Sequence, residues 1–550
     1  RPMHSILCIF DGQLLPVSFG PITSNNTTKG HRFMAPNVSQ IASIEEYKQA
    51  MNDNYVMLDK EQRKNVILDK INELTEPLGL QLSDDPALLD EVAGLVEYPV
   101  PLLGKFEERF MSLPKEVLVS VMRYHQKFFV LLDKQGKIAP YFIGVSNVVP
   151  KDGNDTIVKG YERVLTARLE DAAFFWQQDL ALSLDEHVEG LANVVFHAKL
   201  GTVEQKAKRI AALAKLMGVW VPHTDLLQAE QAAKLAKADL VTQMVGEFAE
   251  LQGIMGYYYA LEQGLDEDLA IALKDHYKPQ GVSDDLPENP LGVVVSLADK
   301  VDTLVGLFVV GDRPTGSKDP YALRRAALGV IRIILDNHLR IPLGLLFEKS
   351  LSLYPKSVIQ KPVEVEPPKK KKMIRLRRTK KKMSRKEQRQ ALEDLIVFFE
   401  DRLRVLLKDS EEISPQIIQA VFDDGVEDDM TRLVLRARAL KSFLATKDGE
   451  RLSAAYKRAA NIVAAEEKKD DDVYQGDVDK ALLTEEAERG LYNEFSSLEP
   501  NIVKCLKEDR FEEAMKHLSG LCEPIDTFFD QVTVNAQDKS VRRNRLMLLS

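Results

Sequence analysis

The sequence predicts a multidomain α+β protein in which a mixed N-terminal α/β region precedes a mainly helical remainder. Three observations support this fold class. The chain has 550 residues, which is more than a single hydrophobic core usually serves. It is 45% hydrophobic and 29% charged, so it can bury cores of its own. Strand-like segments gather in residues 1–150, and helical spacing of apolar residues dominates afterwards.

The N-terminal region, residues 1–150, shows two hairpin patterns around helical sequence. Ser5–Phe10 and Gln13–Phe19 flank Asp11-Gly12, a dipeptide that tolerates the positive φ of a tight turn. A second hairpin is predicted over Lys127–Val145, with its turn at residues 133–136. Between the hairpins, Ile44–Leu74 has helical spacing. We therefore expect a mixed α/β domain here.

Residues 151–350 show almost no strand signal and are expected to form a helical domain. Helices are predicted over Val164–Gln178, Gln205–Met217, Ala229–Glu247, Leu269–His276, Leu291–Phe308 and Pro320–Asn337.

Residues 351–390 have the composition of a linker with a basic insertion. Lys369–Arg389 contains thirteen Lys or Arg and one acid, Glu387, for a net charge of +12. The whole chain has a net charge of −10, so the remainder carries −22. The basic run is interpreted either as a solvated linker or as a source of non-specific RNA affinity. Helical spacing resumes over residues 391–550, the fourth predicted domain, which the acidic stretch Glu466–Asp472 divides.

Composition excludes several classes of protein. No apolar run approaches the roughly 20 residues of a membrane-spanning helix, so no membrane association is expected. The cysteines, Cys8, Cys505 and Cys522, are far apart and form no CxxC pair. This argues against a disulfide framework and favours a cytoplasmic protein. The histidines form no HxxxH pair, so the strongest metalloprotease signal is missing.

Residues 311–318 (GDRPTGSK) come close to a phosphate-binding P-loop. A true P-loop places lysine before the hydroxyl residue, whereas Ser317 precedes Lys318 here, and Pro314 removes a backbone donor. A structured loop between two helices is the preferred interpretation.

The helical domain also invites comparison with HD-type metal phosphohydrolases. Asp239 and Asp299 stand where the two metal-binding aspartates would be expected, but Ala238 replaces the histidine of the His-Asp pair. Too few imidazoles remain for a divalent site, even if His276 contributes. We therefore expect no metal site and no catalytic residue in this chain.

Several segments resemble the beta subunit of the bacterial, two-subunit glycyl-tRNA synthetases, and they occur in the family's order over nearly the whole chain. They are Thr27–Phe33 (TTKGHRF), Met122–Phe129 (MRYHQKFF), Glu162–Leu169 (ERVLTARL), Lys237–Thr242 (KADLVT), Glu250–Gly256 (ELQGIMG), Gly316–Arg325 (GSKDPYALRR), Pro524–Asp530 (PIDTFFD) and Arg543–Leu546 (RNRL). The basic run Lys369–Arg389 is not part of this pattern, and the family's N-terminal portion and last helix are expected to be missing.

The resemblance implies a heterotetrameric glycine–tRNA ligase of alpha and beta subunits. The alpha subunit is expected to hold the class II active site with its ATP and Mg²⁺, while this chain positions tRNA(Gly). For the fold, the resemblance implies an α/β region akin to part of the phenylalanyl enzyme's beta subunit, a degenerate HD-like domain, and a helical anticodon-binding domain similar to that of arginyl-tRNA synthetase.

Two clusters of cations are the predicted tRNA-binding residues. Arg542, Arg543 and Arg545 are expected on the last helix, where guanidinium groups can bridge phosphates or stack on bases. Lys318, Arg324 and Arg325 lie at a predicted helix start, where backbone N–H groups also favour phosphate. The first cluster can equally be an ordinary solvated basic face, and Arg324 and Arg325 can equally tether their helix to neighbouring acids.

Two other functions stay open from the sequence: a stand-alone HD-type metal phosphohydrolase acting on nucleotides or RNA, and a non-enzymatic RNA-binding scaffold.

Overall fold

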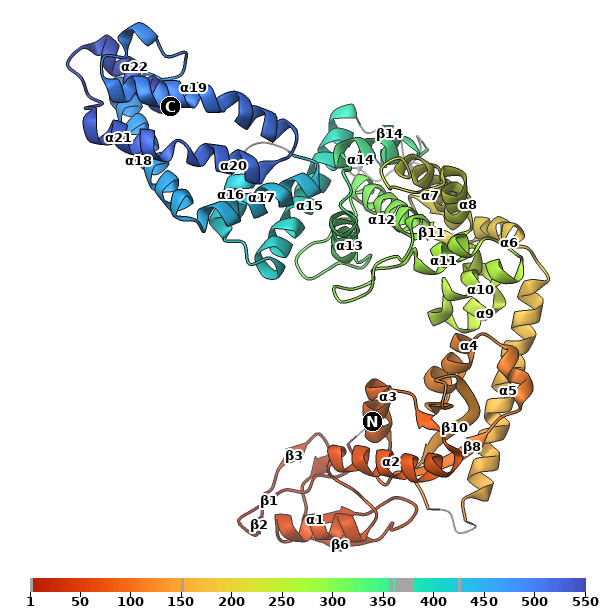
Figure 1. Cartoon of the computed structure of the whole chain (residues 1–550). Coiled ribbons are helices and arrows are strands. Elements are labelled where there is room, and N and C mark those ends of the chain that lie inside the picture. The colour runs from red at the N-terminus through yellow and green to blue at the C-terminus, as the bar shows by residue number, and fades with distance from the viewer. Residues whose placement is uncertain (1–2, 150–152, 356–359, 363–379, 383, 424–426) are drawn as a thin grey trace, which may run out of the picture. The chain divides into compact units, whose positions relative to one another are not determined.

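The computed structural model describes residues 3–149, 153–355, 360–362, 380–382, 384–423 and 427–550, coloured from the N-terminus to the C-terminus in Figure 1. The chain divides into two compact units, each formed by two stretches. Unit 1 combines Arg1–Val194 with Leu235–Lys274, and unit 2 combines Val195–Lys234 with Asp275–Ser550. The four domains predicted from the sequence group the residues differently, and their boundaries stay a prediction.

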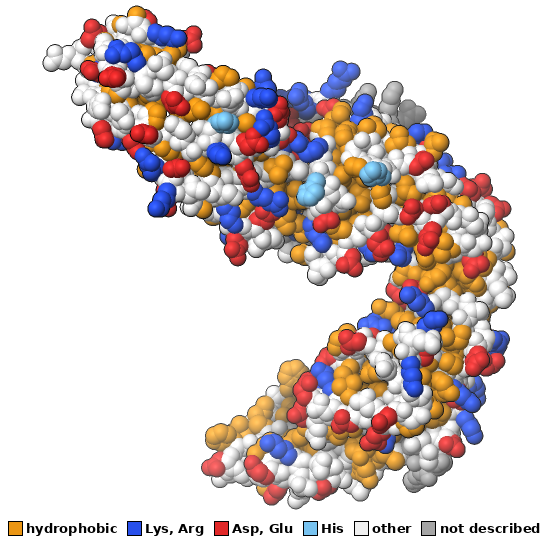
Figure 2. Space-filling view, viewed as in Figure 1, with side chains coloured by type: hydrophobic (Ala, Val, Ile, Leu, Met, Phe, Trp, Pro, Cys, Tyr) orange, Lys and Arg blue, Asp and Glu red, His pale blue; other side chains and the backbone are white. Residues whose placement is uncertain are grey.

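Unit 1 begins with short antiparallel hairpins. They are β1 (Ile9–Phe10) with β2 (Gln13–Leu14), β3 (Ser18–Phe19) with β4 (Ile22–Thr23), and β5 (Thr27–Lys29) with β6 (Val38–Gln40). Asp11 and Gly12 form the first turn with φ values of +48° and +73°, so the predicted turn is confirmed. The strands beside it are shorter than predicted, because β2 ends at Leu14 and Ser18–Phe19 pairs with β4 instead. Figure 2 shows hydrophobic side chains gathered over these hairpins. They leave Phe10 75% exposed and Phe19 67% exposed.

A four-stranded antiparallel sheet forms the core of unit 1. Its strand order is β7 (Gln81–Leu82), β9 (Phe129–Leu132), β10 (Ile138–Ser146), β8 (Val100–Lys105). The predicted second hairpin is confirmed as β9 and β10. Helices α2 (Lys60–Thr75) and α3 (Pro86–Leu95) cover the sheet with an apolar stripe, because their buried residues recur at helical spacing. The shared core contains Ile67, Ile71, Leu88, Val92, Ala93, Phe129, Leu131 and Ile143.

Helices and short helical turns complete unit 1. They are α1 (Ile44–Asp53), α4 (Lys115–Ser120), α5 (Asp155–Leu180), α6 (Leu184–Gly190), α9 (Gln243–Glu247), α10 (Ile254–Glu262) and α11 (Glu267–Asp275), with the turns η1 (Glu76–Leu78), η2 (Glu108–Ser112), η3 (Val121–His125), η4 (Leu191–Asn193), η5 (Ala238–Val241) and η6 (Ala249–Leu251).

Unit 2 is mainly helical. Its elements are β11 (Val195–His197), β12 (Gly201–Thr202), α7 (Val203–Met217), α8 (Leu226–Leu235), α12 (Pro290–Val310), α13 (Leu323–Asp336), α14 (Leu343–Ser352), β13 (Gln360–Pro362), β14 (Lys380–Lys382), α15 (Arg385–Ser410), α16 (Pro415–Phe422), α17 (Met430–Leu444), α18 (Lys447–Asp470), η7 (Lys480–Leu482), α19 (Glu486–Lys507), α20 (Phe511–Ser519), α21 (Cys522–Gln531) and α22 (Lys539–Leu549). Helix α12 is buried along most of its length and packs against α7, α13, α14 and α15. The α+β fold class is thus confirmed.

The prediction of one helix over Ala229–Glu247 is wrong. Helix α8 ends at Leu235, the turn η5 follows, and α9 begins at Gln243. Thr242 starts α9, because its hydroxyl accepts the backbone N–H of Val245 at 3.3 Å. Among the residues that the structure describes, none of the helices combines the length and apolarity needed to cross a bilayer.

Candidate nucleic-acid interface

Helix α22 carries the three arginines predicted to contact RNA. Asp538 caps the helix by accepting the backbone N–H of Ser540 at 2.7 Å. Arg542 lies against the end of α18, where it forms ion pairs with Glu466 and, at 2.5 Å, with Asp470. The Arg542 guanidinium holds the pKa of the Glu466 carboxyl below its ordinary value. Arg542 is only 17% exposed, so most of its hydrogen-bonding capacity is used within the protein.

Arg543 and Arg545 lie in opposite environments on the same helix. The side chain of Arg543 is 50% exposed, forms an ion pair with Asp472, and lies 5.6 Å from the ring centroid of Tyr474. Arg545 is 7% exposed and pairs with Glu488, which is fully buried. Its guanidinium also donates to the carbonyl of Thr533 at 2.7 Å. Arg545 therefore ties helices together inside the bundle, and Arg543 is the arginine of the three that reaches the surface.

The acidic stretch Glu466–Asp472 has a role that the sequence did not indicate. It ends α18 ahead of α19, as the prediction of a divider implies. From there Glu466, Asp470 and Asp472 neutralise Arg542 and Arg543. RNA contact by the α22 arginines stays a prediction, with Arg543 as its best placed residue.

The second predicted cluster surrounds the start of α13. Lys318 and Arg325 are exposed, whereas Arg324 donates to the carbonyl of Gly316 at 2.7 Å. The carboxylate of Asp319 accepts the backbone N–H groups of Leu323 at 2.8 Å and of Arg324 at 3.0 Å. Because Asp319 occupies the helix N-terminus, phosphate binding by these backbone groups is not supported, and any contact with RNA falls to the exposed cations.

The segment that resembles a P-loop is a loop between α12 and α13, as predicted. Thr315 and Lys318 bond each other through their backbones, with N–H to carbonyl distances of 3.0 and 2.7 Å. These donors are therefore turned inward and do not form a phosphate cradle. Arg313 in the same loop pairs with Asp394 of α15 at 2.5 Å.

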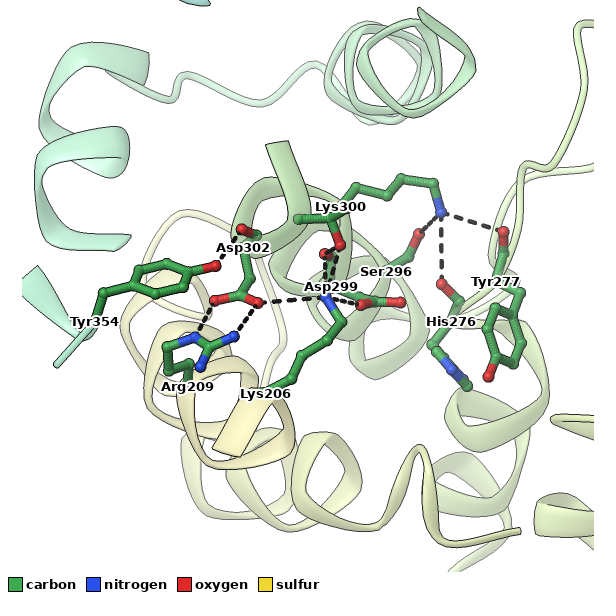
Figure 3. A network of polar contacts seen from close by, with 10 residues as sticks. Lys206, Arg209, His276, Tyr277, Ser296, Asp299, Lys300, Asp302 and Tyr354 are labelled. Atoms are coloured by element: carbon green, nitrogen blue, oxygen red, sulfur yellow. Dashed lines mark hydrogen bonds and ion pairs between the residues drawn. The ribbon is translucent and has the colours of Figure 1, made fainter. Parts of the chain in front are cut away.

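A network of buried charges joins α7 to α12 (Figure 3). The Lys206 ammonium lies 2.7 Å from Asp299 and 3.3 Å from Asp302, and it donates to the hydroxyl of Thr303 at 2.6 Å. Arg209 binds Asp302 with two donors, at 2.7 and 3.1 Å. The Tyr354 hydroxyl donates to the Asp302 carbonyl at 2.7 Å.

Protein cations therefore compensate both aspartates of this network, as buried carboxylates require. On the other side of α12, Lys300 points away from them and donates to the carbonyl of Tyr277 and to the hydroxyl of Ser296 (Figure 3). It also donates to the carbonyl of Lys278 at 2.8 Å.

Asp239, the other aspartate compared with HD enzymes, caps a helix. It is 1% exposed, and its carboxylate accepts the backbone N–H groups of Gly253 and, at 3.3 Å, Gly256 at the start of α10. Burial raises the pKa of this carboxyl to about 6. His276 is fully buried with its ring centroid 3.9 Å from that of Tyr277. Within the described ranges, no group of three or more His, Cys, Asp or Glu residues could hold a metal ion. The HD-like fold stays a prediction.

The C-terminal helices of unit 2 line an open pocket of about 1030 Å³ that the sequence did not reveal. Its lining includes Tyr456, which is 71% exposed, and Phe495, which is 44% exposed. Tyr492 also lines it and lies 5.1 Å from the Lys480 ammonium. Exposed rings such as Tyr456 and Phe495 are suited to stacking on unpaired bases. Sequence pattern alone treats such rings as core, so only their exposure in the fold identifies them.

Comparisons with known proteins cover the whole chain. The family model described as glycyl-tRNA synthetase beta subunit matches residues 1–423, and the model described as DALR anticodon binding domain matches residues 452–550. Over its full length the chain is 43% identical to the glycine–tRNA ligase beta subunit of Rhodospirillum centenum, of which it covers 77%. It is 41% identical to that of Rickettsia canadensis and 42% identical to that of Paracoccus denitrificans, covering 75% and 76% of these relatives.

Proposed function

The chain belongs to the family of glycyl-tRNA synthetase beta subunits, and on this premise we propose that it binds and orients a glycine tRNA for glycylation at an active site on a separate alpha subunit. The observation that carries this proposal is the order of the two matches. A beta-subunit region over residues 1–423 is followed by an anticodon-binding domain over residues 452–550. A protein that holds the anticodon end can accelerate the reaction at the other end of the tRNA by positioning alone.

The chemistry of the described residues supports this division of labour. In the loop at residues 311–318 the backbones of Thr315 and Lys318 bond each other, and Asp299 and Asp302 are neutralised by Lys206 and Arg209. These sites are therefore structural. ATP and Mg²⁺ are expected at the alpha subunit.

RNA contacts are expected from exposed cations and rings in unit 2. Arg543, Lys318 and Arg325 present charge at the surface, and Tyr456 presents a ring on α18. Such groups bind phosphates and stack on unpaired bases. The partners would then be tRNA(Gly) and the alpha subunit, as a heterotetramer in the cytoplasm. Neither alternative function, the metal phosphohydrolase or the scaffold without a synthetase partner, gains support from the comparisons.

Reconstitution tests the proposal. The purified chain, an alpha subunit of the same family and the mixture of both are compared for attachment of labelled glycine to tRNA(Gly), and binding of the tRNA to the chain is measured by filter retention. We expect glycylation only in the mixture and tRNA binding by the chain itself. Activation of glycine with ATP by the chain alone, or no tRNA binding in either the chain or the mixture, would overturn the proposal.

A further inference from the structure

A rigid loop in unit 1 presents two cations and an aromatic ring to solvent. The loop joins β5 to β6, whose ends pair at Lys29 and Val38. Lys29 and Arg32 are exposed, and Phe33 is 72% exposed. The Arg32 guanidinium carbon lies 5.4 Å from the centroid of the Phe33 ring. The charged group of Arg32 and the ring of Phe33 therefore lie next to each other at the surface.

Contacts beneath the loop fix its conformation. His31 is fully buried, and its Nδ1 accepts the backbone N–H groups of Phe33 and Met34, each at 3.2 Å. The backbone N–H of His31 donates to the carbonyl of Asn54, at the end of α1, at 2.8 Å. A Cβ atom on Gly30 would come within 2.3 Å of the Asn54 Cβ, so the close approach requires glycine. The presented side chains thus stand on a preorganised base, which lowers the entropic cost of binding.

The two cations of the loop have no anionic partner among the described residues. In the part of the chain that the structure describes, neither Lys29 nor Arg32 forms an ion pair or a side-chain hydrogen bond. Some other cations of unit 1 are paired: Arg109 with Glu107 at 2.9 Å, and Lys127 with Glu91 at 2.9 Å. A cation without an acidic partner, beside an exposed ring, is free to meet an anionic ligand that also offers a flat face.

The hairpins before this loop have a different character. Phe10 and Phe19 are also exposed, but residues 3–28 contain no lysine or arginine. Lys29 and Arg32 are therefore the first cations after this stretch, and the Arg32 guanidinium lies beside the Phe33 ring. A purely apolar partner would use the rings and gain nothing from the cations. An unpaired nucleotide uses both, because its base stacks on an aromatic face and its phosphates pair with cations.

We propose that the loop of Lys29, Arg32 and Phe33 is an RNA-binding site, in which an unpaired nucleotide of the tRNA stacks on Phe33 while Lys29 and Arg32 contact its flanking phosphates. The site rests on the proposed function of tRNA binding and adds a contact in unit 1, outside the residues matched by the anticodon-binding domain. Because the proposed contacts are stacking and phosphate pairing, the site adds affinity for the tRNA and helps to orient it, without selecting a particular base.

Three variants of the full chain, studied with the alpha subunit, test the site. Phe33→Ala is expected to weaken tRNA binding about tenfold through loss of stacking. Phe33→Trp keeps a ring and is expected to retain wild-type affinity. Lys29→Gln with Arg32→Gln should lower the slope of log affinity against log salt by about 0.7 for each lost phosphate contact. Phe19→Ala, an equally exposed phenylalanine without neighbouring cations, is the matched control and should leave binding unchanged.

The outcomes separate this site from the function on which it rests. If the wild-type complex binds tRNA and Phe33→Ala binds it equally well, the site is refuted while the proposed function stands. If the wild-type complex itself does not bind tRNA, the proposed function fails. If Phe33→Ala reduces retention of the alpha subunit and leaves tRNA affinity unchanged, the loop is a protein-docking surface and the RNA site is again refuted. Because Phe33 packs little against the fold, thermal unfolding of the Phe33 variants is expected to match the wild type.

Discussion

Burial decides what each arginine of α22 does. A guanidinium is always charged, so an arginine inside a protein must meet a carboxylate or several carbonyls. Arg545 meets both, in Glu488 and the carbonyl of Thr533. Arg543 keeps half of its side chain in water, and its pair with Asp472 can open at little cost. The same residue type on one helix thus provides an internal tie and a surface contact.

Replacing Arg545 is expected to destabilise the C-terminal bundle strongly. Arg545→Ala leaves the fully buried Glu488 without its partner, which costs about 3–5 kcal/mol. Arg543→Ala, the matched control on the same helix, should change the free energy of unfolding by at most about 1 kcal/mol. Urea unfolding followed by circular dichroism measures both. Arg545→Met combined with Glu488→Leu should recover most of the loss, because neither charge is then buried alone. Equal unfolding of the two single variants would contradict this account.

The sequence located these cations but not their environments. Arg542, Arg543 and Arg545 were recognisable as a basic cluster, yet their partners Glu466, Asp472 and Glu488 lie far away in the chain. Only the packing of helices shows which face of α22 is covered. Phe33 and Tyr456 were missed as candidate site residues for the opposite reason. Their exposure, and not their residue type, distinguishes them from core aromatic side chains.

Buried aspartates hold the short helices of unit 1 in place. Asp179 accepts the backbone N–H groups of Gln243 and Met244 at the start of α9, at 2.8 and 2.9 Å. Asp239 does the same for α10 through Gly253 and Gly256. These caps come from elsewhere in the chain, so no local sequence signal marks them. A helix with a clear apolar stripe, such as α7, was predicted well, because its pattern is local.

The cap on α10 makes part of the stability of unit 1 depend on pH. The Asp239 carboxyl has an ordinary pKa of 3.8, and burial raises it to about 6 in the folded chain. Between these values the folded state binds more protons than the unfolded state, so the free energy of unfolding falls as pH rises. The contribution of Asp239 is fully present below about pH 4 and is lost as pH rises through about 6. At low pH, Asp239 contributes about 3 kcal/mol to the free energy of unfolding.

Asp239→Asn removes this titration and provides the test. The difference in unfolding free energy between wild type and variant should fall between pH 4 and pH 6 and be constant above pH 7. Trp176 of α5 is stacked on Tyr259 of α10, with ring centroids 5.1 Å apart, so its fluorescence reports on this region. The chain has two tryptophans, and Trp220→Phe in both proteins leaves Trp176 as the sole indole probe. A difference that does not vary with pH would show that the carboxyl keeps its ordinary pKa.

Charge is distributed unevenly over the whole molecule. The net charge of −10 combines +12 in Lys369–Arg389 with −22 elsewhere. In the described residues many acids are used in ion pairs, as Glu466 and Asp472 illustrate, so local cations rather than net charge decide where RNA can bind. Most of the basic run lies outside the described residues, and both interpretations of it, linker and RNA-binding segment, stay predictions. Its charge can still be tested.

Neutralising the basic run separates the two interpretations. Replacing Lys369–Lys372, Arg375, Arg377 and Arg378 by glutamine removes seven positive charges while keeping the length of the segment. If the run binds RNA non-specifically, affinity for an unrelated RNA falls at low salt, and the slope of log affinity against log salt becomes shallower by about 0.7 to 0.9 for each lost phosphate contact.

A variant with the four lysines changed to arginine keeps the charge and should behave as wild type. Because the contact carries no base information, the preference for tRNA(Gly) over the unrelated RNA should rise in the glutamine variant. Unchanged affinity and salt dependence would assign the run to the solvated linker.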